Sequence, residues 1–257
     1  MKHTKTLAIL CMAAILCIIA IPASADEIAT AGRLVVTKWQ DAIVSVQLVA
    51  KTTVTYEGEQ SPPEENKLEA NALVIDPSGL VVAPLSEVSP DESASDFGED
   101  PTKYSVSTEI SDVKILMVSG QEIPAKLVLR DKELDLAFIR PIDKPAKPMT
   151  AVDLSKGAKP ALLDQVLALS RQGIAANRAL AASLDRIETV VEKPRFFSIP
   201  DIGLDMGASV FMLDGTFAGL IVMRQLPAAA GSSDWYNNST QIILPAADIL
   251  EAAKQAP

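Results

Sequence analysis

This sequence has almost no histidine and almost no cysteine. Its 257 residues include one histidine, His3, and two cysteines, Cys11 and Cys17, all close to the N-terminus. From residue 18 onward, the chain therefore has no imidazole to act as a general base and no thiol to act as a nucleophile or form a disulfide. It also has no His or Cys metal ligand there. We expect neither a metal nor another cofactor.

The first 25 residues predict a secretory signal peptide. A basic start (residues 2–5) precedes an apolar run (residues 7–21), and Pro-Ala-Ser-Ala then supplies a cleavage site after Ala25. The apolar run is 15 residues long, shorter than the roughly 20 residues that span a bilayer as a helix. We therefore expect a secreted or periplasmic protein that begins at Asp26 and has no stable membrane anchor after cleavage. An uncleaved anchor is the alternative.

Aromatic residues and positive charge are also scarce. Only 4% of the residues are aromatic, so the core must consist mainly of Val, Leu, Ile and Ala. Without disulfides, a secreted domain depends on such a core for its stability. The net charge is −10, and loss of Lys2 and Lys5 with the signal peptide makes it −12. An acidic surface disfavours binding to nucleic acid and to anionic membranes.

Short apolar segments separated by turn signals predict an all-β protein. Strands are expected at residues 43–48, 70–75, 80–82, 113–118, 123–129, 136–139, 165–169, 179–184, 187–191, 209–213, 217–223 and 241–244. Asp-Pro-Ser-Gly (76–79) and Asp-Gly (214–215) are typical of tight turns. We expect loops at the polar segment 56–67 and at the acidic segment 89–103, and a helix at 246–255.

A cluster of prolines divides the chain into two halves. Pro141, Pro145 and Pro148 fall within eight residues, which predicts an inter-domain connector. The expected organisation is an amphipathic lead-in and a first barrel (26–142), the connector (143–151), and a second barrel with a C-terminal helix (152–257). Many short strands on both sides of one connector favour this two-barrel architecture.

Three ordered segments resemble the trypsin-like serine proteases of the Deg/HtrA type. Residues 72–83, with Asp-Pro-Ser-Gly at their centre, resemble the strand-turn-strand unit that precedes the catalytic histidine. Residues 115–137 end in Asp-Leu-Ala and resemble the segment that carries the catalytic aspartate. Residues 206–215, followed by Gly219, are similar to the segment that carries the nucleophile.

The resemblance covers nearly all of residues 40–255, with weaker similarities at 164–169 and 242–245. It implies two six-stranded antiparallel β-barrels with a C-terminal helix and a peptide-binding cleft between the barrels. Many family members continue into a PDZ domain, which this chain is expected to lack.

The catalytic residues implied by the resemblance are mostly replaced. The histidine position falls on Ser86 and the nucleophile position on Met206, whereas the aspartate position is Asp135. The glycine of the oxyanion hole is replaced by Leu204, so that pocket is not expected to form. A thioether cannot attack an amide, and a serine cannot act as a base near neutral pH. We therefore expect no proteolytic activity from these positions.

Several residues near these positions allow other interpretations. Ser209 could be a relocated nucleophile, although it more naturally occupies the family's proline position, and a Ser-Lys pair elsewhere is a second possibility. We expect Asp135 to serve the fold by accepting hydrogen bonds from backbone or from Ser86. Glu87 is expected to be an exposed acid at a short helix. Two tryptophans could line a cleft but are more typical of packing, namely Trp39 and Trp235.

The leading functional hypothesis is a secreted pseudoprotease. It would bind an extended peptide or protein partner in the inter-barrel cleft, as a regulatory or scaffolding protein of the cell envelope. One alternative is an active serine endopeptidase with a relocated or non-standard catalytic site. Another is a structural envelope component whose cleft is buried in an oligomer. The sequence does not specify the oligomeric state.

Overall fold

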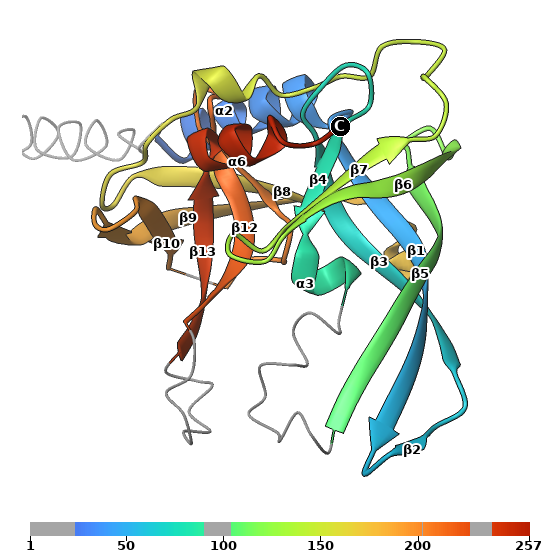
Figure 1. Ribbon diagram of the computed structural model, residues 1–257. Helices are drawn as coiled ribbons and strands as arrows, with labels where there is room; N and C mark the ends of the chain where they lie inside the picture. Colours follow the sequence, from blue (N-terminus) through green and yellow to red (C-terminus); the bar gives the residue numbers. More distant parts are fainter. Residues whose placement is uncertain (1–23, 90–103, 202, 227–237) are drawn as a thin grey trace, which may run out of the picture.

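The computed structural model describes residues 24–89, 104–201, 203–226 and 238–257. These residues form two β-barrels, and helices α2 (Ser24–Trp39) and α6 (Ala246–Ala253) lie at the top of the view in Figure 1. Most of the expected signal peptide, most of the acidic segment 89–103, and Trp235 lie outside the described residues. The predicted all-β fold, with two six-stranded antiparallel barrels and a C-terminal helix, is confirmed. No helix among the described residues is long and apolar enough to cross a membrane.

The first barrel consists of six strands closed by pairing of the first with the last. Their order around the barrel is β1 (Ile43–Tyr56), β3 (Glu64–Val74), β4 (Val81–Pro84), β7 (Leu136–Pro141), β6 (Glu122–Asp131) and β5 (Tyr104–Leu116). The short strand β2 (Glu59–Gln60) extends the edge of β1. β1, β3 and β5 project beyond the barrel toward the lower right of Figure 1.

Alternation of side chains along β1 separates the barrel interior from its surface. Val44, Val46 and Leu48 are buried in the interior cluster, whereas Ser45 and Gln47 point to the opposite face of the sheet. The expected turn at 76–79 connects β3 to β4. Its residue Gly79 has a φ of +98°, a conformation that glycine adopts without strain.

The second barrel also has six strands in a closed ring. Their order is β10 (Phe197–Pro200), β13 (Ser239–Pro245), β12 (Phe217–Gln225), β11 (Ser209–Met212), β8 (Gln165–Arg171) and β9 (Leu180–Val191). The expected Asp214-Gly215 turn joins β11 to β12, with Gly215 at a φ of +82° and the Thr216 N–H donating to Asp214 Oδ1 at 2.8 Å.

Helix α2 precedes the first barrel in the chain but packs against the second. Trp39, at its end, donates its indole N–H to the Gly215 carbonyl at 2.8 Å and stacks on Phe211. Trp39 therefore has a packing role. The proline-rich segment after β7 contains no helix or strand, and its Met149 N–H donates to the Pro77 carbonyl at 3.0 Å. The connector is thereby held against the β3–β4 turn.

Three apolar clusters form the core. One fills the first barrel, a second fills the second barrel, and the largest lies where the barrels meet each other and the two helices. Leu73 and Phe138 of the first barrel and Leu169 of the second are all fully buried in this shared cluster. Burial of this shared apolar surface stabilises one arrangement of the two barrels.

Several predicted boundaries are wrong. Most of the predicted loop 56–67 is strand or hairpin, because β3 already begins at Glu64 and β2 lies between β1 and β3. The strands predicted at 179–184 and 187–191 are one strand, β9, and β10 was not predicted. β5 begins at Tyr104, nine residues before its predicted start. The misses in β3 and β5 share a cause: polar strands on an exposed sheet do not show an apolar alternation.

Candidate functional site

An open groove of about 650 Å³ runs between the two barrels. One wall consists of residues from β1, β3 and the short helix α3 (Leu85–Val88), including Gln47, Glu69 and Glu87. The opposite wall consists of residues from β8, the segment that follows it, and the segment before β11. The two barrels thus contribute one wall each, as the sequence predicts for a cleft between them.

A free strand edge borders this groove. Five consecutive residues of β3, from Lys67 to Asn71, line it. Successive side chains of a strand point to opposite faces, so the whole series can line one groove only if the strand's backbone edge faces it. β3 pairs with β1 on one side; on the other, the described strands pair with it only at Leu73 and Val74 of β3, and the Asn71 carbonyl packs against Gly207.

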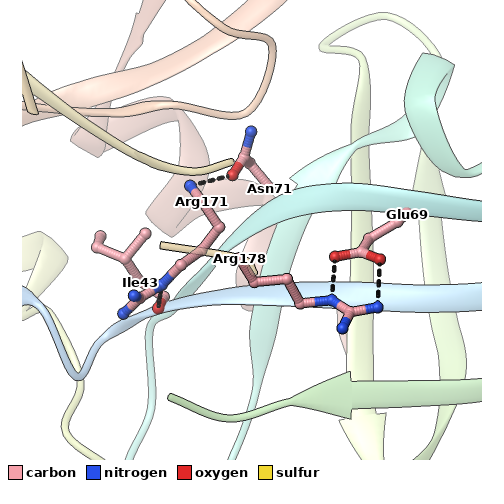
Figure 2. A network of polar contacts seen from close by, with 5 residues as sticks. All are labelled: Ile43, Glu69, Asn71, Arg171 and Arg178. Atoms are coloured by element: carbon pink, nitrogen blue, oxygen red, sulfur yellow. Dashed lines mark hydrogen bonds and ion pairs between the residues drawn. The ribbon is translucent and has the colours of Figure 1, made fainter. Parts of the chain in front are cut away.

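An ion pair bridges the groove. Arg178 of the second barrel donates to both carboxylate oxygens of Glu69 on β3, at 2.7 and 2.8 Å (Figure 2). Such a bidentate arrangement fixes orientation as well as distance. Both side chains are partly exposed, so the pair contributes more to the groove's shape and charge pattern than to overall stability.

A second polar network holds the walls together deeper in the groove. Asn71 Oδ1 accepts from the Arg171 N–H at 2.5 Å, and Asn71 Nδ2 donates to the Met206 carbonyl at 3.1 Å. The Arg171 guanidinium donates to the Ile43 carbonyl at 2.9 Å and the Gln40 carbonyl at 2.6 Å; Figure 2 shows the contact with Ile43. One asparagine and one arginine therefore tie β1 and β3 to the second barrel.

Asp135 and Ser86, the positions that the resemblance implies for the catalytic aspartate and histidine, lie together. Asp135 Oδ1 accepts from the Ser86 N–H at 2.7 Å, and Oδ2 accepts from Ser86 Oγ at 3.0 Å. Oδ2 also accepts from the N–H of Met223, on β12 of the second barrel, at 2.9 Å. The expected contact between Asp135 and Ser86 is confirmed. The carboxylate joins α3, the β6–β7 turn and the second barrel.

The ionisation of Asp135 reflects a competition between burial and hydrogen bonding. Burial raises the pKa of Asp135 to about 6, although the hydrogen bonds from Met223 and Ser86 lower it. The side chain is 8% exposed, so the cost of burying its charge outweighs the three donors. The part of the chain that the structure describes contains no imidazole for this carboxylate to orient, and its observed partners are the Ser86 N–H and hydroxyl and the Met223 N–H.

Leu204 and Met206 lie on the second barrel, Leu204 in its core and Met206 at the edge of that core. Leu204 is 8% exposed and buried in the interior cluster of that barrel, and Met206 packs against the same cluster while lining the groove. The backbone of the next residue, Gly207, is held between β12 and β3. The Gly207 N–H donates to the Ile221 carbonyl at 2.9 Å, and a Cβ at Gly207 would lie 2.5 Å from the Asn71 carbonyl oxygen.

The serine proposed as a relocated nucleophile, Ser209, is poorly placed, and so is the Ser-Lys pair in the groove. Ser209 is 0% exposed, so a substrate could not reach it, and its hydroxyl has no hydrogen-bond partner among the described residues. Ser45 and Lys67 both line the groove, but Ser45 pairs with Asn71, four residues along β3 from Lys67. Four residues of strand correspond to about 13 Å, beyond the combined reach of the two side chains.

The other sequence candidates have simpler roles. Glu87 is exposed on α3 and lines the groove, as expected for an acid on a short helix. Among the described residues, no group of three or more His, Cys, Asp or Glu side chains could hold a metal ion.

Sequence reasoning missed the polar residues that shape the groove. Glu69 and Arg178 are 109 residues apart, and Asn71 and Arg171 are 100 apart. No local motif marks such pairs. The only available signal was the presence of polar residues, such as Asn71, next to the apolar run of β3.

No protein-family model matches this chain, and no curated protein is significantly similar to it in sequence. The functional interpretation therefore depends on the groove and on the residues in its walls.

Proposed function

We propose that this protein is a secreted or periplasmic pseudoprotease of the trypsin-like type, which binds an extended peptide or protein segment in the groove between its barrels. The observation that carries the proposal is the backbone edge of β3 along the groove at residues 67–70, with which no described strand pairs on the side away from β1. An unpaired edge offers a row of N–H and C=O groups to which an extended chain can add as a further strand.

The absence of hydrolysis in this proposal follows from the residues at the catalytic positions. Proteolysis of the Ser-His-Asp type needs a hydroxyl nucleophile and an imidazole base. Here Met206 supplies a thioether, and Ser86 supplies a hydroxyl that donates to Asp135. Neither group can perform the missing step, and the carboxylate has no base to orient.

The size and charge of the groove support a peptide ligand. Its volume of about 650 Å³ lies within the typical range of ligand sites, about 300–1,000 Å³. Lys67 and Asp205 are charged groups along its walls, in addition to the Glu69–Arg178 pair. Backbone pairing along β3 would supply affinity, and these side chains would select the sequence of the bound segment.

Binding can be tested by blocking the groove without altering the fold. Gly173 lines the groove, and a Cβ there would meet nothing within 4 Å, so Gly173→Trp attaches a bulky side chain at the groove from an open position. Leu162→Trp is the matched control, because Leu162 is exposed and is not part of the groove lining.

The assay is selection from a randomised decapeptide library by the chain of residues 26–257, followed by fluorescence anisotropy with the selected peptides. We expect Gly173→Trp to weaken binding by at least about tenfold, or 1.4 kcal/mol, and Leu162→Trp to leave it unchanged. Failure to enrich any peptide, or equal binding by both variants, would overturn the proposal.

A further inference from the structure

A second free strand edge lies on the other side of β1. β5 pairs with β1 along its length, but β6 pairs with β5 only at Lys114, Ile115 and Leu116. Among the described strands, none pairs with residues 105–111 on the side away from β1. This part of β5 projects from the barrel in Figure 1. Seven residues thus present an open row of backbone donors and acceptors, which we call the β5 edge.

The two free edges differ in how they are protected. Near the β3 edge, Pro62 and Pro63 precede the strand, and four of its first six residues are charged. Prolines and charges are the usual means by which proteins prevent unwanted strand pairing. The β5 edge has the sequence Ser-Val-Ser-Thr-Glu-Ile-Ser, with no proline and one charge, Glu109. Its side chains favour strand pairing and do little to prevent it.

We infer that the β5 edge pairs in antiparallel fashion with the β5 edge of a second copy of this chain. A two-fold axis perpendicular to the sheet keeps equivalent residues on the same face, which allows an isologous dimer. The straight part of β5 is centred on Thr108 and ends at Asp112, whose φ of +46° accompanies a register shift in the pairing with β1. The axis is placed at Thr108.

The register centred on Thr108 is self-complementary. It sets Val106 of each copy opposite Ile110 of the other, and Ser107 opposite Glu109. Apolar side chains thus face apolar ones, and no like charges stand directly opposite each other. Glu109 lies beside Lys51 of its own β1, which partly balances its charge. A one-residue slip would place side chains on the wrong faces, and a register centred on Glu109 would oppose two carboxylates.

The dimer leaves both grooves open. β1 lies between β3 and β5, so the β3 edge and the β5 edge face opposite directions. Pairing at β5 would join the projecting β3, β1 and β5 strands of two copies into one six-stranded sheet with one groove in each copy. This inference does not depend on the proposed peptide binding, because no residue of the β5 edge lines the groove.

Opposite charges at one position test the register. Ser107 is exposed and opposite Thr53 on β1, so either charged side chain is accommodated in the folded monomer. Ser107→Glu would place two pairs of like charges opposite each other, and Ser107→Lys would place two pairs of opposite charges there. In sedimentation velocity, we expect the natural chain (26–257) to dimerise at micromolar concentrations. Ser107→Glu should weaken the dimer about tenfold, and Ser107→Lys should not weaken it.

Cysteine cross-linking provides a second readout, because residues 26–257 contain no cysteine. Thr108→Cys should form an intermolecular disulfide under mild oxidation, because residues opposite each other in an antiparallel pair have Cα atoms about 4.5–5.5 Å apart, within disulfide range. In this register, residue 105 lies opposite Ser111 of the other copy. Ser105→Cys should therefore not form a disulfide with the cysteine at position 105 of the other copy. A monomer at all concentrations, equal weakening by both charges at 107, or equal cross-linking at 105 and 108 would overturn the inference.

Discussion

The two barrels carry the positions that the resemblance implies for catalysis in opposite chemical form. In the first barrel, Asp135 and Ser86 form a polar cluster in which one carboxylate accepts three hydrogen bonds. In the second barrel, Leu204 and Met206 are apolar; Leu204 is buried in the barrel core and Met206 packs against it. The Asp135 carboxylate has a structural role that does not require catalysis, because it joins α3 to β12. Leu204 contributes in a different way, since its side chain adds to the apolar core of the second barrel.

The largest expected effect comes from removing the Asp135 carboxylate, which joins α3 to β12. Asp135→Ala would leave the partly buried N–H groups of Ser86 and Met223 without their acceptor and remove the bond from the Ser86 hydroxyl, at a cost of about 4 kcal/mol in the free energy of unfolding. Asp135→Asn retains one acceptor oxygen and tolerates the positive φ of this position, so its loss should be smaller. Urea unfolding of both variants checks this. A loss below about 1 kcal/mol for Asp135→Ala would show that the fold does not depend on the hydrogen bonds to Asp135.

The pH dependence of stability tests the same carboxylate. Because burial raises the pKa of Asp135 to about 6, the folded state binds its proton more tightly than the unfolded state does. Its contribution to stability is therefore present at low pH and is lost as the pH rises through 6. The stability difference between the natural chain and Asp135→Asn should fall by on the order of 3 kcal/mol between about pH 4 and pH 7.

Urea unfolding of both proteins across this pH range provides the measurement. Asp135→Asn is the control for the natural chain, because the two proteins share all other acidic groups. A stability difference that rises with pH would mean that the hydrogen bonds from Ser86 and Met223 outweigh burial.

The apolar wall predicts a packing effect without pH dependence. Leu204→Ala removes a buried side chain from the second-barrel core and should lower stability by about 2–3 kcal/mol. Leu226→Ala is the control: Leu226 is 50% exposed, and its loss should change stability by less than about 0.5 kcal/mol. Thermal unfolding distinguishes the two. Similar effects at both positions would contradict the assignment of Leu204 to the core.

The smallest expected effect is a gain in stability. Ser209 Oγ is buried without a hydrogen-bond partner, so Ser209→Ala should be neutral or stabilise the protein by up to about 1 kcal/mol. Ser198→Ala, at the other buried serine whose hydroxyl has no partner, should behave in the same way. A clear loss of stability in Ser209→Ala alone would indicate that this hydroxyl has a partner and a role.

The sequence was informative where local chemistry decides the structure. The turns at 76–79 and 214–215 and the apolar strands next to them follow from glycine, proline and period-two alternation. The contact between Ser86 and Asp135 followed from counting along a resemblance. Prediction failed for the outer part of β3, where Glu64 and Lys67 lie in a strand that is polar on both faces. It also failed for the pair Glu69–Arg178, which only the packing of two barrels brings together.

The most direct test of the central claim is covalent labelling of the chain of residues 26–257 by a fluorophosphonate probe, followed by intact-protein mass spectrometry. An active trypsin-like protease and the double variant Ser86→His, Met206→Ser are analysed beside it, and unfolded casein is added in parallel. The account predicts that the natural chain gains no mass and leaves casein intact, while the active protease is labelled. A stable adduct on any serine of the natural chain would contradict it and would identify the nucleophile.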